Sequence, residues 1–93
     1  MTEIKTLHIL NKSPEHPRFT RCLTVAGPED TVLLIENGVL GLVAASASAS
    51  GKLLALDADL AARGVGNQSG TVETVDYDAM VELTTRAQQV ISW

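Results

Sequence analysis

The chain has 93 residues, of which 45% are hydrophobic and 3% aromatic, so aliphatic side chains must fill its interior. This length corresponds to one domain, near the lower limit at which a layered core is stable alone. The formal net charge of −4 and the scattered basic residues argue against direct nucleic-acid binding. A single cysteine, Cys22, excludes an internal disulfide framework and a multi-cysteine metal site.

Two further features concern location and assembly. The segment Met1–Lys5 lacks the basic region and apolar run of a signal peptide, and Val39–Ala49 is too short and serine-rich to cross a bilayer. We therefore expect a soluble cytoplasmic protein with no membrane association. Because so small a domain carries so much apolar surface, we also expect it to bury part of that surface against a partner.

Strand and helix patterns alternate from the start of the chain. Thr6–Leu10 is predicted as the first strand. A helix follows, either with Ser13 as its N-cap and Pro14 at its first position, or beginning later at Pro17. Gly27-Pro28 ends this helix. Its apolar face repeats at helical spacing and consists of Phe19, Cys22, Leu23 and Ala26.

The middle of the chain continues the alternation. Thr31–Ile35 is apolar almost throughout, which is typical of a parallel strand covered on both faces. Glu36–Gly38 is predicted as a turn into a helical segment from Val39 to about Ala45. Ser46–Gly51 consists of small residues, and we expect a mobile loop there. Lys52–Leu56 is predicted as the third strand.

The C-terminal third begins with a short helix. Asp57 is predicted to cap it, and Gly64 is predicted to end it directly after Arg63, whose side chain can bond the terminal carbonyls. Val65–Gly70 is predicted as a polar loop, and Thr71–Val75 as the fourth strand.

The last segments complete the pattern. Asp76 is predicted to cap a helix from Tyr77 to about Arg86, and Val90–Trp93 to form a short fifth strand. Such alternation indicates a mainly parallel sheet with helices on both faces. The predicted fold is therefore α/β, a single domain over residues 1–93 with four or five strands.

Polar residues follow the predicted strands, where open parallel sheets place their chemistry. They form no recognisable catalytic set, phosphate loop or metal-ligand spacing, so we expect no cofactor and no metal. Helix capping explains Asp57 and Asp76 without catalysis. His8 lies within the first strand and is favoured as a packed or hydrogen-bonded core residue, whereas His16 is expected to be solvated.

Cys22 is the residue with intrinsic covalent chemistry. A persulfide carrier needs a thiolate, which requires exposure and a positive neighbourhood, and Arg18 and Arg21 lie within one helical turn. However, Cys22 is in phase with the apolar face that begins at Phe19, which predicts burial. The residues alone therefore favour a core cysteine and leave the carrier role open.

Several segments, taken in order, resemble the DsrH/TusB family. Leu7–Pro14 is similar to the opening of that family, and Leu33–Val39 is similar to its second strand and turn. Asp59–Gly64 resembles its helix end of the form DL-x-ARG. Asp76–Thr84 resembles its segment of the form DY…FV-x-LT, with Met80 in place of the usual aromatic residue. The order and spacing of these segments together indicate the family more specifically than any single segment does.

The resemblance covers nearly the whole chain, up to a short tail that closes on Trp93. It implies a DsrE-type fold and assembly with two sister subunits into a heterohexamer, either TusBCD or DsrEFH. Such complexes pass sulfur as a cysteine persulfide to a TusE/DsrC-type carrier. The carrier cysteine of the sister subunit lies between the third strand and the next helix, where this chain has Leu56 and Asp57. The resemblance therefore implies an accessory subunit of a sulfurtransferase complex.

The function predicted first is a subunit, partnered by TusC- and TusD-like chains, of the relay that ends in 2-thiouridine at the tRNA wobble position. The second is a DsrH-type subunit, partnered by DsrE- and DsrF-like chains, in dissimilatory sulfur oxidation. The third is a purely structural oligomer with an inert cysteine. Several DsrH-like members have a cysteine at the position of Cys22, so the resemblance brings its carrier role level with its core role.

Overall fold

A computed structural model describes residues 3–43, 49–65 and 72–93. It contains a five-stranded sheet in the order β4-β3-β2-β1-β5, and every neighbouring pair is parallel. The predicted parallel α/β sheet is confirmed. The strands are β1 (Ile4–Leu10), β2 (Thr31–Leu34), β3 (Lys52–Leu56), β4 (Glu73–Val75) and β5 (Ala87–Ser92).

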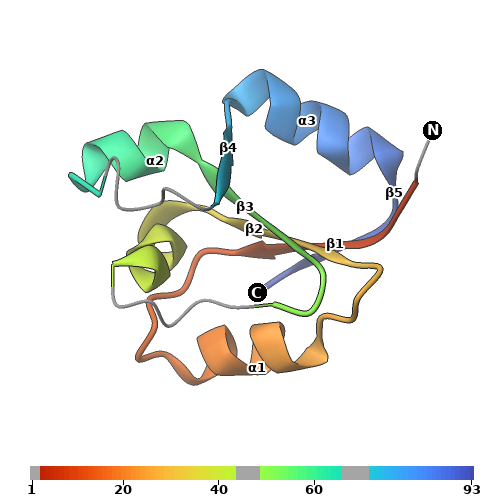
Figure 1. Cartoon of the computed structure of the whole chain (residues 1–93), viewed down its shortest axis with the longest axis horizontal. Coiled ribbons are helices and arrows are strands. Elements are labelled where there is room, and N and C mark those ends of the chain that lie inside the picture. Colours follow the sequence, from red (N-terminus) through yellow and green to blue (C-terminus); the bar gives the residue numbers. More distant parts are fainter. Residues whose placement is uncertain (1–2, 44–48, 66–71) are drawn as a thin grey trace.

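Helices cover both faces of this sheet, as predicted. Figure 1 shows α1 on one side of the strands and α3 on the opposite side. The helical segments are α1 (Pro17–Val25), the 3₁₀ helix η1 (Glu36–Leu42), α2 (Asp57–Ala62) and α3 (Tyr77–Arg86).

The strand order explains which face each helix covers. From β1 to β4 the chain steps in one direction across the sheet, and it then returns to place β5 on the far side of β1. Because crossovers between parallel strands are right-handed, a reversal of direction moves the connecting helix to the other face. Thus α1, η1 and α2 share one face, whereas α3 covers the other.

Each face has its own apolar core. The core under α1, η1 and α2 includes Leu10, Phe19, Cys22, Ala26, Val32, Leu34, Val39, Ala55, Leu60 and Val65. The core under α3 is smaller, with Ile4, Leu7, Leu33 and Leu54 buried and Met80 and Leu83 of the helix packed against them. No residue of α3 is itself fully buried. The α3 layer is therefore the less completely covered one.

The ends of α1 and α3 follow their local sequence. Of the two predicted starts for α1, the later one is right, because Pro17 is its first residue and His16 caps it. His16 is exposed, and its Nδ1 accepts a hydrogen bond of 3.1 Å from the amide of Arg18. The predicted cap of α3 is also confirmed, since Asp76 Oδ1 accepts a bond of 2.8 Å from the amide of Ala79.

Several boundaries differ from the predictions. The strand β1 begins at Ile4 rather than Thr6, and β2 ends at Leu34 rather than Ile35. The helical segment η1 begins at Glu36 rather than Val39, because the predicted turn is already wound as 3₁₀ helix. Asp57 is the first residue of α2 rather than its cap; the cap position is Leu56, which makes no side-chain cap bond. The fifth strand begins at Ala87, so α3 passes into it directly.

Parts of four predicted segments lie outside the described residues. Residues 44 and 45 belong to the predicted helical segment, 46–48 to the loop after it, 66–70 to the polar loop and 71 to the predicted fourth strand.

Candidate functional site

A polar network lies at the carboxyl edge of the sheet, where η1 meets the end of α2. Arg63 Nε donates a hydrogen bond of 3.0 Å to Asn37 Oδ1. The same guanidinium lies 3.5 Å from Asp59 Oδ1, and the other carboxylate oxygen of Asp59 accepts a bond of 2.7 Å from the Glu36 amide. The sequence predicts that Arg63 bonds helix carbonyls; its side chain instead joins two segments of the chain.

The backbone at this edge has little freedom. Glu36 has φ of +50°, a left-handed conformation that non-glycine residues rarely adopt. The hydrogen bond from its amide N–H to the Asp59 carboxylate, together with the next residues of η1, holds it in this conformation. A Cβ atom at Gly38 would overlap the carbonyl oxygen of Leu10, so β1 and η1 approach each other only because this residue is glycine. A left-handed backbone conformation such as that of Glu36 is often found at functional sites.

The same edge receives the end of the chain after β5. The amide of Trp93 donates a bond of 2.9 Å to the Ile9 carbonyl. Lys12 Nζ donates to the main-chain oxygen of Trp93 at 2.5 Å and to Asn11 Oδ1 at 2.7 Å. Four of the segments that carry the family resemblance, represented by Lys12, Asn37, Arg63 and Trp93, therefore meet at one edge although they are dispersed through the sequence.

The side chain of Trp93 reaches back along the sheet to His8. Trp93 Nε1 lies 3.0 Å from His8 Nδ1, and His8 Nε2 lies 3.0 Å from Asp30 Oδ2. His8 is 1% exposed, so the expected hydrogen-bonded core histidine is confirmed. Its position is polar inside an otherwise apolar layer, and both ring nitrogens have partners, as buried polar groups require.

Asp30 is the last member of the hydrogen-bonded chain that runs from Trp93 through His8. Partial burial raises the pKa of its carboxyl group, but hydrogen bonds from the Gly27 amide and from His8, with the nearby charge of Lys5, outweigh that effect and lower the pKa overall. The Gly27 amide lies 3.0 Å from Asp30 Oδ2. Asp30 is therefore held as a carboxylate at neutral pH.

Cys22 lies inside the core between α1 and the sheet. Its side chain is 0% exposed, and burial raises the pKa of its thiol to about 12. Arg18 and Arg21 are exposed on α1. In this conformation the thiol is protonated at neutral pH and out of reach of a second protein, whereas a carrier needs an accessible thiolate.

The junction between β3 and α2 also carries no thiol. Leu56 ends the strand and is 1% exposed, whereas Asp57 begins the helix at the surface. Neither side chain forms a covalent sulfur adduct. The described residues thus contain one sulfhydryl group, and it is the buried one.

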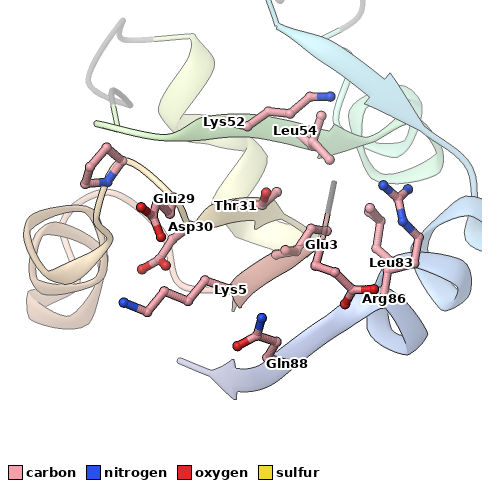
Figure 2. A pocket seen from close by; sticks show the side chains of 12 residues that line it. Glu3, Lys5, Glu29, Asp30, Thr31, Lys52, Leu54, Leu83, Arg86 and Gln88 are labelled. Atoms are coloured by element: carbon pink, nitrogen blue, oxygen red, sulfur yellow. The ribbon is translucent and has the colours of Figure 1, made fainter. Parts of the chain in front are cut away.

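A cavity of about 680 Å³ lies at the opposite, amino edge of the sheet (Figure 2). Its floor includes Ile4, Leu54 and Leu83, and charged side chains such as Lys5 and Asp30 surround it. Its volume is within the range of small-molecule sites. Sequence patterns do not indicate this cavity, because they place the expected chemistry at the carboxyl edge and the lining residues are not adjacent in sequence.

Metal-ligand clusters and membrane-spanning helices are both absent from the described residues. These residues contain no group of three or more His, Cys, Asp or Glu side chains arranged to hold a metal ion. In the same part of the chain, no helix has the length and apolarity needed to span a membrane.

Together, these features define a small parallel α/β protein whose strand ends are joined by side-chain bonds and, in the described part of the chain, carry no accessible thiol. A family model described as DsrH like protein matches residues 12–90. The chain belongs to this family.

Individual relatives agree with that assignment. Proteins named Protein TusB from Yersinia pestis and Yersinia pseudotuberculosis are each 32% identical over 94 residues, covering 94% of this chain and 99% of the relative. The solution NMR structure of Tm0979 from Thermotoga maritima superimposes with a TM-score of 0.67 at 26% identity. That similarity covers 86% of this chain and 91% of Tm0979.

Proposed function

We propose that this chain is an accessory subunit of a cytoplasmic sulfur-relay complex that delivers persulfide sulfur toward 2-thiouridine at the tRNA wobble position. The observation that carries the proposal is the match, over nearly the full length of both chains, to proteins named TusB. The DsrH family match over residues 12–90 supports it. The TusB name of these relatives favours the tRNA branch over sulfur oxidation.

The accessory role rests on the position of the thiol. Leu56 and Asp57 occupy the place where the resemblance puts the carrier cysteine of the sister subunit. Cys22 is buried, and its raised pKa keeps it protonated. We therefore propose that Cys22 fills the core and that the persulfide travels on a sister subunit. The alternative, that Cys22 carries sulfur, requires α1 to move away from the sheet.

The proposed partners are TusC- and TusD-like sister subunits, with a TusE-like carrier downstream, in a heterohexamer. The incompletely covered α3 layer supports assembly, because Tyr77 and Val81 are spaced one turn apart and are 55% and 59% exposed. The net charge of −4 supports an indirect relation to RNA. The isolated chain is accordingly expected to show no salt-dependent affinity for tRNA.

The experiment is complementation of a bacterium that lacks its TusB subunit. Expression of this chain should restore 2-thiouridine in the tRNA, measured by mass spectrometry of nucleosides, and the chain should co-purify with the sister subunits in a defined ratio. Cys22→Ala should restore the modification as well as the unmodified chain does, provided that it assembles. Failure to restore 2-thiouridine in an assembled complex would overturn the tRNA proposal.

A matched variant separates assembly from sulfur transfer. Val81→Glu places a charge on the exposed side of α3 and should weaken co-purification while the isolated chain stays folded. Glu82→Gln, at the next exposed position of α3, should leave co-purification unchanged. A chain that remains monomeric beside its sister subunits in light scattering would contradict the relay-subunit assignment.

A further inference from the structure

The protonation state of His8 is fixed by its two neighbours. An indole N–H donates a hydrogen bond and accepts none, so His8 Nδ1 must offer its lone pair to Trp93 Nε1 across 3.0 Å. The proton of the neutral ring therefore sits on Nε2, where it bonds Asp30 Oδ2 across 3.0 Å. The geometry defines one tautomer of a buried, neutral imidazole, with each nitrogen in a different role.

We propose that His8 is a proton-operated latch for the side chain of Trp93. A proton taken from water binds to the Nδ1 lone pair, and no covalent bond between heavy atoms changes. Nδ1–H then faces the N–H of Trp93, and two donors cannot form a hydrogen bond with each other. The indole must leave, whereas the Nε2–H bond to Asp30 is retained and becomes charge-assisted. This proposal does not depend on the sulfur-relay function.

The surroundings of His8 give the latch two opposing forces. Asp30, in the turn before β2, is the charged group in direct contact with the ring and favours the protonated form. Lys5, on the same strand, lowers the pKa of Asp30 and so helps to keep that carboxylate ionised. Trp93 favours the neutral form. The described elements packed around β1 add uncharged side chains, namely Val32 of β2, Ile91 of β5 and, on the inner side of α1, the neutral thiol of Cys22.

The latch acts on the indole and leaves the main chain in place. The Trp93 amide stays bonded to the Ile9 carbonyl at 2.9 Å, and Lys12 Nζ holds the Trp93 main-chain oxygen. The indole itself is partly buried against the core under α1. Its release would expose an aromatic surface beside Lys12 at the carboxyl edge of the sheet. Aromatic side chains of this kind are frequent anchors in protein interfaces.

The chain contains the reporters that a direct test needs. Trp93 is its single tryptophan, and His8 and His16 are its two histidines. Between about pH 8 and pH 5, the range in which imidazole side chains change charge, the emission maximum of Trp93 should shift to longer wavelength along a one-proton curve. The far-UV circular dichroism should stay constant over the same range, because the latch does not unfold the chain.

Two variants assign the transition to the correct ring. His16→Gln removes the exposed histidine and should leave the shift unchanged, whereas His8→Gln should abolish it. If His8→Gln does not fold, ¹⁵N NMR of the unmodified chain provides the test. At pH 8 it should show the Nε2–H tautomer, and the Trp93 indole N–H resonance should move together with the titration of His8.

Three results would overturn the latch. One is the Nδ1–H tautomer at pH 8, and a second is a folded chain in which His8 does not titrate down to about pH 5. The third is an indole resonance and an emission maximum that stay constant while His8 takes up its proton.

Discussion

Arg63 and Asn37 are 26 positions apart in sequence, yet Arg63 Nε donates a hydrogen bond of 3.0 Å to Asn37 Oδ1. The bond joins the C-cap residue of α2 to η1, and the same guanidinium lies 3.5 Å from Asp59. It brings together in the fold two segments that resemble the family, each of them short and weak as a sequence signal. One of them supplies the fork-shaped donor and the other supplies the acceptor.

Replacement of Arg63 tests how much this bond stabilises the edge. Arg63→Ala should lower the free energy of unfolding by about 1 kcal/mol, the usual contribution of a side-chain hydrogen bond supported by a partly exposed ion pair. Arg63→Lys keeps the charge but loses the Nε donor, so it should recover only part of the loss. Urea denaturation followed by circular dichroism measures the difference.

Arg21→Ala is the matched control, because Arg21 is exposed on α1, away from the contacts of this edge. It should change the free energy of unfolding by less than about 0.5 kcal/mol. Equal losses in the two variants would mean that net charge, and not the bond to Asn37, explains the effect.

The sequence is informative wherever structure is set locally. The bounds of β3 and α3 and the Asp76 cap follow from apolar runs and from capping chemistry within a few residues. The prediction for Asp57 is wrong because an acidic residue favours both the cap and the first helical turn, and the two positions are one residue apart. The choice between them depends on how β3 enters the helix.

The side-chain partners at the site cannot be derived in the same way. His8 and Trp93 are 85 positions apart, and they meet because β5 returns to pair with β1. That return depends on the strand order, which local patterns do not determine. The double hydrogen bonding of His8 is therefore visible only in three dimensions, although its place within an apolar strand already indicates a partner.

The close approach of β1 and η1 leads to a prediction for Gly38. In Gly38→Ala the new Cβ would overlap the Leu10 carbonyl, so the backbone must shift, and we expect a loss of about 1–3 kcal/mol in the free energy of unfolding. Thermal or urea denaturation measures it. At Gly27 a Cβ would have its nearest neighbour, Asp30 Oδ2, at 4.0 Å, so Gly27→Ala is a control with ordinary contacts. A Gly38→Ala variant as stable as Gly27→Ala would contradict the close approach of the two segments.

The buried thiol predicts slow chemistry at Cys22. Because its pKa is raised to about 12, almost no thiolate exists at neutral pH, and the covered side chain excludes reagents. A disulfide reagent should therefore modify the native chain much more slowly than the denatured chain. Thr20→Cys provides an exposed thiol on the same helix and should react rapidly with one equivalent. Rapid modification of Cys22 in the native chain, or a persulfide on it after incubation with a sulfur donor, would restore the carrier role.

A substitution at the same position tests the core role by a different measurement. Cys22→Ser places a hydroxyl among apolar side chains and should lower the free energy of unfolding by roughly 1–3 kcal/mol. Thr20→Ser, at the exposed position, should have little effect. A Cys22→Ser variant with unchanged stability would show that the side chain has solvent or a polar partner in solution.

The lowered pKa of Asp30 predicts how acid affects stability. Because the folded pKa lies below the unfolded value of about 4, the carboxylate stabilises the fold fully above that value, and the contribution is lost as the pH falls through the folded pKa. Asp30→Asn removes this titration. The difference in urea midpoint between the two chains should therefore be present above about pH 4 and shrink below it. Glu82→Gln, which removes an exposed carboxylate of α3, is the control and should show a small difference at every pH. If the gap between Asp30→Asn and the unmodified chain stayed constant into acid, the hydrogen bonds from His8 and the Gly27 amide would not be what holds this carboxylate ionised.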